Sequence, residues 1–278
     1  EIQFSRTNWL GNISGIGLNS AGLAQKVGES GVLGISFMNM NYGDIQITTT
    51  ELPEGGIGTF NPSSTNFNIA YAKKFSSSIS GGLNLKVVSQ SISNVRAQGV
   101  AIDAGIRYIT GETDNIKFAI SLKNVGPPMS FSGDGLSIDM LNPSTSISIG
   151  MRQRVSTFEL PSQLNIGASY DFNFNESNKL TLASTFSANS FSRDQIRGGL
   201  KYTLSSEKAI FSIFGGYVYE NSLLNLEEVA TALSGPSGGF SFLFPFGSNN
   251  SKIGVDYCYR QSVLGGMHSV GARINIGE

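Results

Sequence analysis

The sequence is poor in the residues that most catalytic and metal sites need, because it contains one cysteine, Cys258, and one histidine, His268. A single cysteine excludes an intrachain disulfide and a cysteine-based zinc site. Charged residues make up only 14% of the chain, against about 25% in a typical soluble domain. The net charge of −1 gives no sign of a nucleic-acid partner, and no motif indicates a cofactor. These absences argue against a soluble enzyme.

Long hydrophobic runs are also missing. No segment approaches the roughly 18 consecutive apolar residues that a transmembrane helix needs, whereas glycine is abundant at 34 residues. Several segments instead alternate, as in 79–87, where Leu83, Leu85 and Val87 share one face and Asn84 and Lys86 share the other. Period two is the signature of a strand. Apolar residues outside and polar residues inside predict an all-β transmembrane barrel, with membrane lipid around it.

The alternation predicts about fourteen antiparallel strands in one barrel domain that spans 1–278. Their approximate ranges are 2–9, 12–26, 31–50, 64–75, 78–93, 99–110, 115–131, 161–173, 179–187, 195–205, 209–219, 238–246, 251–261 and 266–277. The segment 144–156 also alternates, but we assign it to a hairpin within a long loop, because bacterial single-chain barrels have even strand numbers. The start at Glu1, without Met or a signal segment, suggests an exported protein with mature residues missing upstream.

The connections support this count. The long ones, 51–63, 132–160 and 220–237, all fall at the same end, and outer-membrane barrels have long external loops and short periplasmic turns. Aromatic residues gather near both ends of the strands, as two interfacial girdles would. The girdle at the short turns is expected to contain Phe75, Tyr108, Tyr170, Phe172, Tyr202, Phe244 and Phe246, and the other one Trp9, Phe131, Tyr217, Tyr219, Tyr257 and Tyr259. The predicted location is the bacterial outer membrane.

Two external segments are candidate docking surfaces for other outer-membrane or secreted proteins. The apolar run 127–131 leads into the longest loop, where it either forms an exposed patch or tucks over the barrel mouth. Loop 220–237 is expected to contain a helix capped by Asn225 and ended by Gly235 and Pro236, with one apolar stripe. The predicted partner-binding residues are Pro127, Pro128, Met129, Phe131, Leu226, Val229 and Leu233.

The inner faces are predicted to be rich in basic residues. The main lumen charges are Lys86, Asp103, Arg107, Arg197, Lys201, Asp256, Arg260 and Arg273, accompanied by Lys117, Lys123, Asp171 and Lys252. They either form a wet, salt-bridged lumen or a path for an anionic group. Glycine pairs at 81–82, 198–199, 215–216, 238–239 and 265–266 mark either bends or a lateral opening in the wall. His268 is interpreted as a rim residue, since no nucleophile-elbow motif accompanies it.

Several short stretches resemble the PorV/PorQ family of outer-membrane proteins from Bacteroidetes, which is related in fold to the FadL fatty-acid transporters. They are 4–9 (FSRTNW), 41–45 (NYGDI), 58–63 (GTFNPS), 122–127 (LKNVGP) and the stretch from Leu160-Pro161 to Tyr170-Asp171. The resemblance implies a fourteen-stranded barrel and a role in type IX secretion, where a PorV-type barrel binds cargo proteins. The family's N-terminal Asn-Pro-Ala-Gly-Leu-like plug motif is absent here, so we expect any plug segment to lie upstream of Glu1.

Two functions follow as alternatives. The first is a protein-binding accessory or subunit of a surface or secretion complex, supported by the resemblance and the external loops. The second is a FadL-like transporter that binds a hydrophobic small molecule, supported by the fold relation, the basic lumen and the glycine pairs. A ligand path that reaches a weakness in the wall favours transport, whereas a sealed lumen favours the scaffold. An outer-membrane hydrolase would rest on His268 alone, so we expect no enzyme.

Overall fold

The computed structural model describes residues 1–9, 11, 15–141, 147–220, 234–247, 251–262 and 265–277. Its long strands are β1 (Ile2–Asn8), β2 (Ile16–Val27), β3 (Gly31–Tyr42), β6 (Ser63–Lys74), β7 (Ile79–Ile92), β8 (Val95–Thr110), β9 (Ile116–Val125), β13 (Gln163–Asn173), β14 (Asn178–Asn189), β15 (Gln195–Ser205), β16 (Ile210–Glu220), β17 (Gly235–Pro245), β18 (Lys252–Ser262) and β19 (Gly265–Asn275). Shorter elements are β4 (Ile45–Gln46), β5 (Thr59–Phe60), β10 (Phe131–Ser132), the 3-10 helix η1 (Asp134–Leu136), β11 (Ser137–Leu141) and β12 (Ser148–Arg152).

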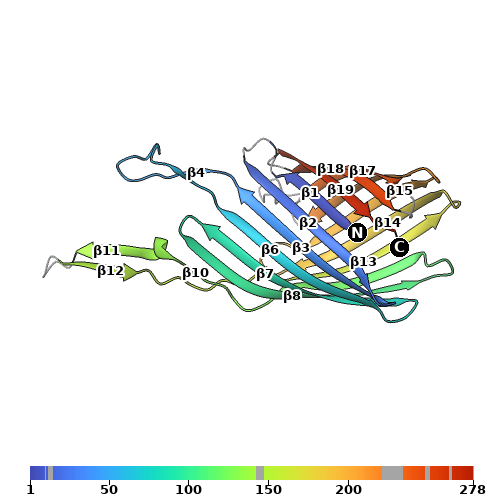
Figure 1. The fold of residues 1–278 in the computed structure, drawn as a ribbon, viewed down its shortest axis with the longest axis horizontal. Helices are drawn as coiled ribbons and strands as arrows, with labels where there is room; N and C mark the ends of the chain where they lie inside the picture. Colours follow the sequence, from blue (N-terminus) through green and yellow to red (C-terminus); the bar gives the residue numbers. More distant parts are fainter. Residues whose placement is uncertain are drawn as a thin grey trace.

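The long strands form one closed antiparallel barrel (Figure 1). Neighbours in the chain pair with one another, β1 closes the ring against β19, and β8 pairs with β9. The sheet has fifteen members, of which β10 is a two-residue strand at the rim, so fourteen strands form the wall. Closure removes the free edges that would otherwise expose unpaired backbone groups in lipid. The predicted all-β barrel and its strand number are confirmed.

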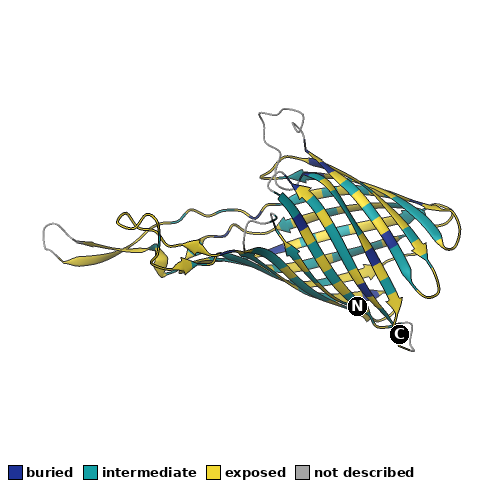
Figure 2. Cartoon of the chain, turned by 90° about the horizontal axis from the view of Figure 1, so that it is seen from above, coloured by how far each residue is buried: buried dark blue, intermediate teal, exposed yellow. Residues whose placement is uncertain are grey.

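Exposed and less exposed residues alternate along the strands (Figure 2). The outward side chains are large and apolar, for example Leu83 at 63% exposure, Ile106 at 52% and Ile166 at 47%. The inward side chains on the same strands are polar, for example Asn84 and Asn165, which form hydrogen bonds across the inner wall. An apolar exterior around a polar interior is stable in lipid and not in water. Among the described residues, no helix is long and apolar enough to span a membrane.

The long connections all lie at one end of the barrel, as predicted. They comprise 43–62, 126–162 and 221–234, whereas 28–30, 75–78, 111–115, 174–177 and 206–209 make tight turns at the other end. Within loop 126–162, β11 and β12 pair as a hairpin that extends away from the barrel (Figure 1). The assignment of 144–156 to a loop hairpin is therefore correct, although the first hairpin strand, 137–141, lies upstream of that range.

Three predicted boundaries were wrong for local reasons. β3 ends at Tyr42, where Gly43 adopts a φ of 84°, and β4 pairs only with β5. β9 ends at Val125, because Gly126, Pro127 and Pro128 follow. β17 begins at Gly235, so Gly235 and Pro236, predicted to end a helix, belong to a strand. The predicted helix itself lies outside the described residues.

The direction of the barrel leads to a labelling prediction. In a variant with Cys258 replaced by Ser, a cysteine at Glu54 or Ser148 is expected to react with an impermeant maleimide on intact cells. Both positions are exposed and lie in the long connections, which face outward in outer-membrane barrels. A cysteine at Ser77, in a short turn, should react only after the cells are lysed. Labelling of Ser77→Cys, but not of Glu54→Cys, on intact cells would show that the inferred orientation of the barrel is wrong.

Candidate functional site

The wall of the barrel is interrupted between β9 and β13. Their ladder runs from the pair Ile116–Tyr170 to the pair Lys123–Gln163. Beyond it, no β-pairing joins residues 124–128 to residues 159–162, all of which the structure describes, and the next bridge connects Met129 with Phe158. Prolines at 127, 128 and 161 contribute to the interruption, because proline has no N–H to donate to a ladder.

A β-bulge on β9 precedes the interruption. The register between β8 and β9 shifts between the pairs Ile102–Val125 and Ala104–Leu122, so β9 has one extra residue there. Asn124 adopts a left-handed conformation with a φ of 59°, which asparagine tolerates better than most residues. Gly126 then passes so close to β8 that a Cβ on it would lie 2.1 Å from the carbonyl oxygen of Val100.

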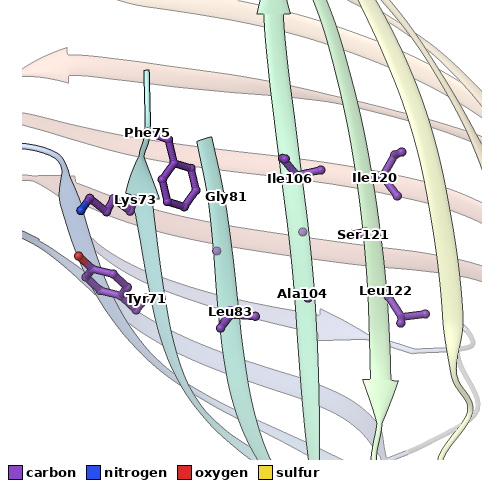
Figure 3. Close-up of a pocket in the computed structure, with 12 residues that line it drawn as sticks. Tyr71, Lys73, Phe75, Gly81, Leu83, Ala104, Ile106, Ile120, Ser121 and Leu122 are labelled. Atoms are coloured by element: carbon purple, nitrogen blue, oxygen red, sulfur yellow. The ribbon is translucent and has the colours of Figure 1, made fainter. Parts of the chain in front are cut away.

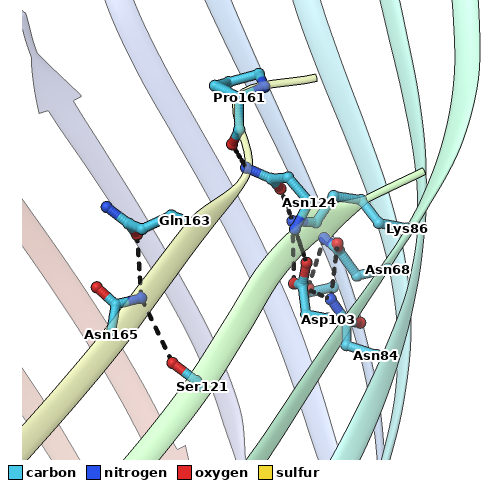
Figure 4. A network of polar contacts seen from close by, with 10 residues as sticks. Asn68, Asn84, Lys86, Asp103, Ser121, Asn124, Pro161, Gln163 and Asn165 are labelled. Atoms are coloured by element: carbon cyan, nitrogen blue, oxygen red, sulfur yellow. Dashed lines mark hydrogen bonds and ion pairs between the residues drawn. The ribbon is translucent and has the colours of Figure 1, made fainter. Parts of the chain in front are cut away.

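A polar network on the inner wall holds this bulge (Figure 4). The carboxylate of Asp103 accepts hydrogen bonds from the backbone N–H of Asn124 at 2.8 Å and from Nδ2 of Asn84 at 2.9 Å. Lys86 places its Nζ 3.0 Å from Asp103 and donates to Oδ1 of Asn124 at 2.6 Å. Asn124 Nδ2 donates to the carbonyl oxygen of Pro161 at 2.8 Å. This side-chain bond links the two strands where the ladder has stopped.

An apolar cluster lies beside this network, nearer to the external mouth. Met129 is 2% exposed and packs on the inner wall, where Gly99 leaves room for it; a Cβ on Gly99 would lie 2.5 Å from Cγ of Met129. Val88, Ala97, Ala101 and Leu160 complete the buried cluster. The half-buried rings of Phe131 and Phe158 stack at a centroid distance of 5.4 Å and pack against it. The mouth therefore presents aromatic surface on one side.

The predicted docking residues occupy different environments. Pro127 and Pro128 are exposed, whereas Met129 and Phe131 contact the barrel's own wall. Phe131 pairs with Ala97 through β10 and packs inward, so its assignment to the outer aromatic girdle was wrong. Leu226, Val229 and Leu233 lie outside the described residues. The segment 129–132 thus follows the tucked alternative. Among the predicted docking residues that the structure describes, Pro127 and Pro128, just before this segment, are available to a partner.

The predicted lumen charges all lie on inward-facing strand positions, and three acidic residues among them are paired. Besides Asp103 with Lys86, Asp171 pairs with Lys117 at 2.5 Å and Asp256 with Arg273 at 3.2 Å. Within the part of the chain that the structure describes, Arg107, Lys123, Lys201, Lys252 and Arg260 form no ion pair. Sequence reasoning missed Glu220, which is 1% exposed and accepts a 2.5 Å hydrogen bond from Gln195, whose Oε1 accepts one from Arg197. Glu220 is the last residue of β16, and the alternating pattern did not identify it as part of a polar inner face.

The glycine pairs do not interrupt the wall. Gly199 pairs with Gly216 and Gly215 with Gly238 in an unbroken ladder across β15, β16 and β17, and the ladder is equally continuous at 81–82. His268, at the outer rim, accepts or donates a 2.8 Å hydrogen bond with the hydroxyl of Tyr257. Among the described residues, no group of acidic, histidine or cysteine side chains could hold a metal ion.

A closed antiparallel barrel with an apolar exterior, aromatic residues at both ends and long loops at one end is an outer-membrane barrel. This architecture places the chain in the bacterial outer membrane. No protein-family model matches the sequence, and no curated protein matches it either.

Solved structures do match the fold. The CymD monoaromatic hydrocarbon channel aligns over 100% of this chain and 88% of its own, with a TM-score of 0.59 at 12% identity. The Pseudomonas putida toluene transporter TodX aligns over 98% and 88%, with a TM-score of 0.57 at 10% identity. The Ralstonia pickettii toluene transporter TbuX aligns over 98% and 88%, with a TM-score of 0.54 at 12% identity. The chain thus shares the FadL-like fourteen-stranded architecture with channels and transporters, and at these identities the likeness concerns the fold.

Proposed function

We propose that this protein is an outer-membrane channel for hydrophobic small molecules. The observation that carries the proposal is the apolar cluster on the inner wall at the external mouth, next to the interruption between β9 and β13. The fold that the chain shares with a monoaromatic hydrocarbon channel and two toluene transporters supports it.

The physical argument concerns where a hydrophobic solute can rest. The rings of Phe131 and Phe158 are half-buried and stacked, so they offer one aromatic face to a solute that enters the mouth. Apolar and aromatic linings with a few polar groups are typical of small-molecule sites. The charged residues farther along the inner wall are unfavourable for an apolar solute. A solute bound at the rings is therefore expected to leave through the wall, because moving farther into the charged lumen costs free energy.

The interruption supplies an exit in this proposal. Val100 and Val125, on the outer surface beside it, are 47% and 46% exposed and apolar, so the wall faces lipid at this height. Separating 124–128 from 159–162 requires breaking the bond between Asn124 and the Pro161 carbonyl, with no backbone ladder to open. A hydrophobic solute gains free energy on entering lipid, at about 25 cal/mol per Å² of apolar surface.

The test is uptake of a labelled aromatic hydrocarbon by cells that express the barrel. Phe131→Ser combined with Phe158→Ser is expected to reduce the initial uptake rate several-fold, because it removes the aromatic face. Phe191→Ser is the matched control, since Phe191 is an exposed external phenylalanine outside the cluster. Uptake that is independent of the barrel, or equally reduced by Phe191→Ser, would refute the channel.

A second candidate function, binding of another protein at the cell surface, is favoured by the β11–β12 hairpin. Ile138 is opposite Met151 and Met140 is opposite Ile149, so these four side chains share one face, and all are about half exposed. A two-stranded hairpin is marginally stable in water, and an apolar patch of this kind is typical of a binding surface. In this candidate function the barrel has a PorV-like role in secretion, and Pro127 and Pro128 form part of the surface that binds the partner protein.

One deletion separates the two candidates. Replacing residues 137–152 by a short Gly/Ser linker removes the hairpin and leaves the cluster in place. If the channel alone is correct, hydrocarbon uptake persists and the set of proteins that co-purify from native membranes is unchanged. Loss of a co-purifying protein with normal uptake would instead support the protein-binding role.

A further inference from the structure

A groove of about 620 Å³ lies on the outer, lipid-facing surface of the wall, across β6, β7, β8 and β9. Small residues make its floor: Gly81 and Ala104 are outward positions on neighbouring strands, where all the surrounding outward side chains are larger. Its sides are formed by Tyr71, Phe75, Leu83, Ile106, Ile120 and Leu122. The hollow exists because two adjacent outward positions have little or no side chain.

Phe75 lies beside the groove at the end near the short turns (Figure 3). Its ring leans over Gly81, where an added Cβ would lie 3.1 Å from Cε2 of Phe75. The opposite end, at Leu83 and Leu122, points toward the middle of the membrane. The groove is therefore a slot that runs from the interface into the hydrocarbon region, which is the shape and chemistry that an acyl chain requires.

The groove has one cation, Lys73. Lys73 shares the outward face with Tyr71 on β6 and with Phe75 just beyond its end, so its side chain projects from the outer surface, and it is exposed. In Figure 3 the Lys73 amine and the Tyr71 hydroxyl both extend to the β3 side of the groove. Lys73 lies close to the 75–78 turn, within reach of the interface, where a lysine places its ammonium among headgroups. A cation and a hydroxyl along one side of an apolar slot, near its interfacial end, are complementary to a phosphate with an attached acyl chain.

We propose that this groove is a binding site for one phospholipid of the periplasmic leaflet. One acyl chain lies over Gly81 and Ala104, and the phosphate interacts with Lys73 and Tyr71. The site faces the membrane and not the lumen, so it does not depend on the proposed channel function. A resident lipid here fills a hollow that would otherwise leave β6 to β9 poorly packed on the lipid side.

The experiment is native mass spectrometry of the purified barrel titrated with dioleoylphosphatidylglycerol, compared with dioleoylglycerol, which has the same chains and no phosphate. Lys73→Gln is expected to weaken phosphatidylglycerol binding about fivefold, the contribution of one basic residue near an anionic surface, and to leave dioleoylglycerol binding unchanged. Ala104→Phe fills the slot and should weaken the binding of both lipids. Folding of each variant is verified by its resistance to SDS before heating.

Matched controls separate a site from general lipid coating. Lys74→Gln removes the next lysine, which points to the other face, and Ala168→Phe adds the same ring at an outward alanine on β13, outside the groove. Both should bind phosphatidylglycerol like the wild type. Equal losses in these controls would mean annular lipid only. If Lys73→Gln leaves phosphatidylglycerol binding unchanged, and dioleoylglycerol binds as tightly as phosphatidylglycerol, the groove binds a neutral hydrophobic molecule and the proposal is overturned.

Discussion

Replacing Ile166 by Arg is expected to destabilise the folded barrel in a bilayer by about 2–4 kcal/mol. Ile166 is 47% exposed on the outer surface of β13 and is paired with Ile120 and Phe186, whose side chains are also outward and apolar. Arginine at this position would have to place its guanidinium in hydrocarbon or distort the bilayer to reach water. Urea unfolding of the barrel in phosphatidylcholine vesicles, followed by tryptophan fluorescence of Trp9, measures the change.

The matched control is Ser169→Arg, three residues along the same strand on the inner face. It should cost much less, because the lumen is polar and Asp171 lies two positions away on the same face. Asn84, the other inner position suggested by the alternation, is a poorer control, since its amide donates to Asp103. Equal destabilisation at positions 166 and 169 would contradict the assignment of the two faces.

The barrel itself could be predicted from the sequence because its information is repeated on every strand. A side chain such as Leu83 or Ile106 belongs to the outer face for the same reason as its neighbours, and one misjudged residue does not change the pattern. Strand parity also placed the three long connections at one end. The exceptions were positions such as Tyr42 and Val125, where a glycine or a proline pair ended a strand inside an alternating run.

The candidate site could not be predicted in the same way, because it depends on a local departure from the pattern. The alternation through 115–131 predicts one uninterrupted strand, and nothing in it shows that Asn124 adopts a left-handed conformation. The composition does contain a signal, in Pro127, Pro128 and Pro161, which together remove three potential ladder donors. The alternating inner face likewise predicts Lys86 and Asp103 as lumen charges, but it does not show that they hold a bulge.

The inward packing of Met129 illustrates the same limit. An apolar run at the start of a long loop is compatible with a docking patch and with a lid, and only the tertiary contact decides between them. That contact needs Gly99 on β8, thirty positions earlier in the chain, to leave space for the methionine side chain. The alternation of apolar and polar residues does not predict such a contact between positions that are distant in the sequence.

Asp103→Ala is expected to destabilise the barrel by about 2–3 kcal/mol, the cost of removing a charged acceptor from partly buried donors. The change leaves the Asn124 backbone N–H without its acceptor and Lys86 without its counter-charge. Both side chains of the ion pair are less than one-fifth exposed, at 13% for Lys86 and 18% for Asp103, so water replaces the lost contacts only in part. Urea unfolding in vesicles measures the loss of stability.

Two comparisons distinguish the role of this network from that of an ordinary lumen ion pair. Asp256→Ala removes a carboxylate from Arg273 on the regular β18–β19 ladder, where both side chains are 28% exposed, and should cost less than about 1 kcal/mol. Asp103→Asn keeps an acceptor for the Asn124 N–H and should fall between the two. Hydrogen exchange gives the second readout: Asp103→Ala should speed exchange at Asn124 and Val125, while Asp256→Ala leaves these amides unchanged. Equal stability losses at Asp103 and Asp256, with no change in exchange at the bulge, would mean that the network does not hold the β9 bulge in place.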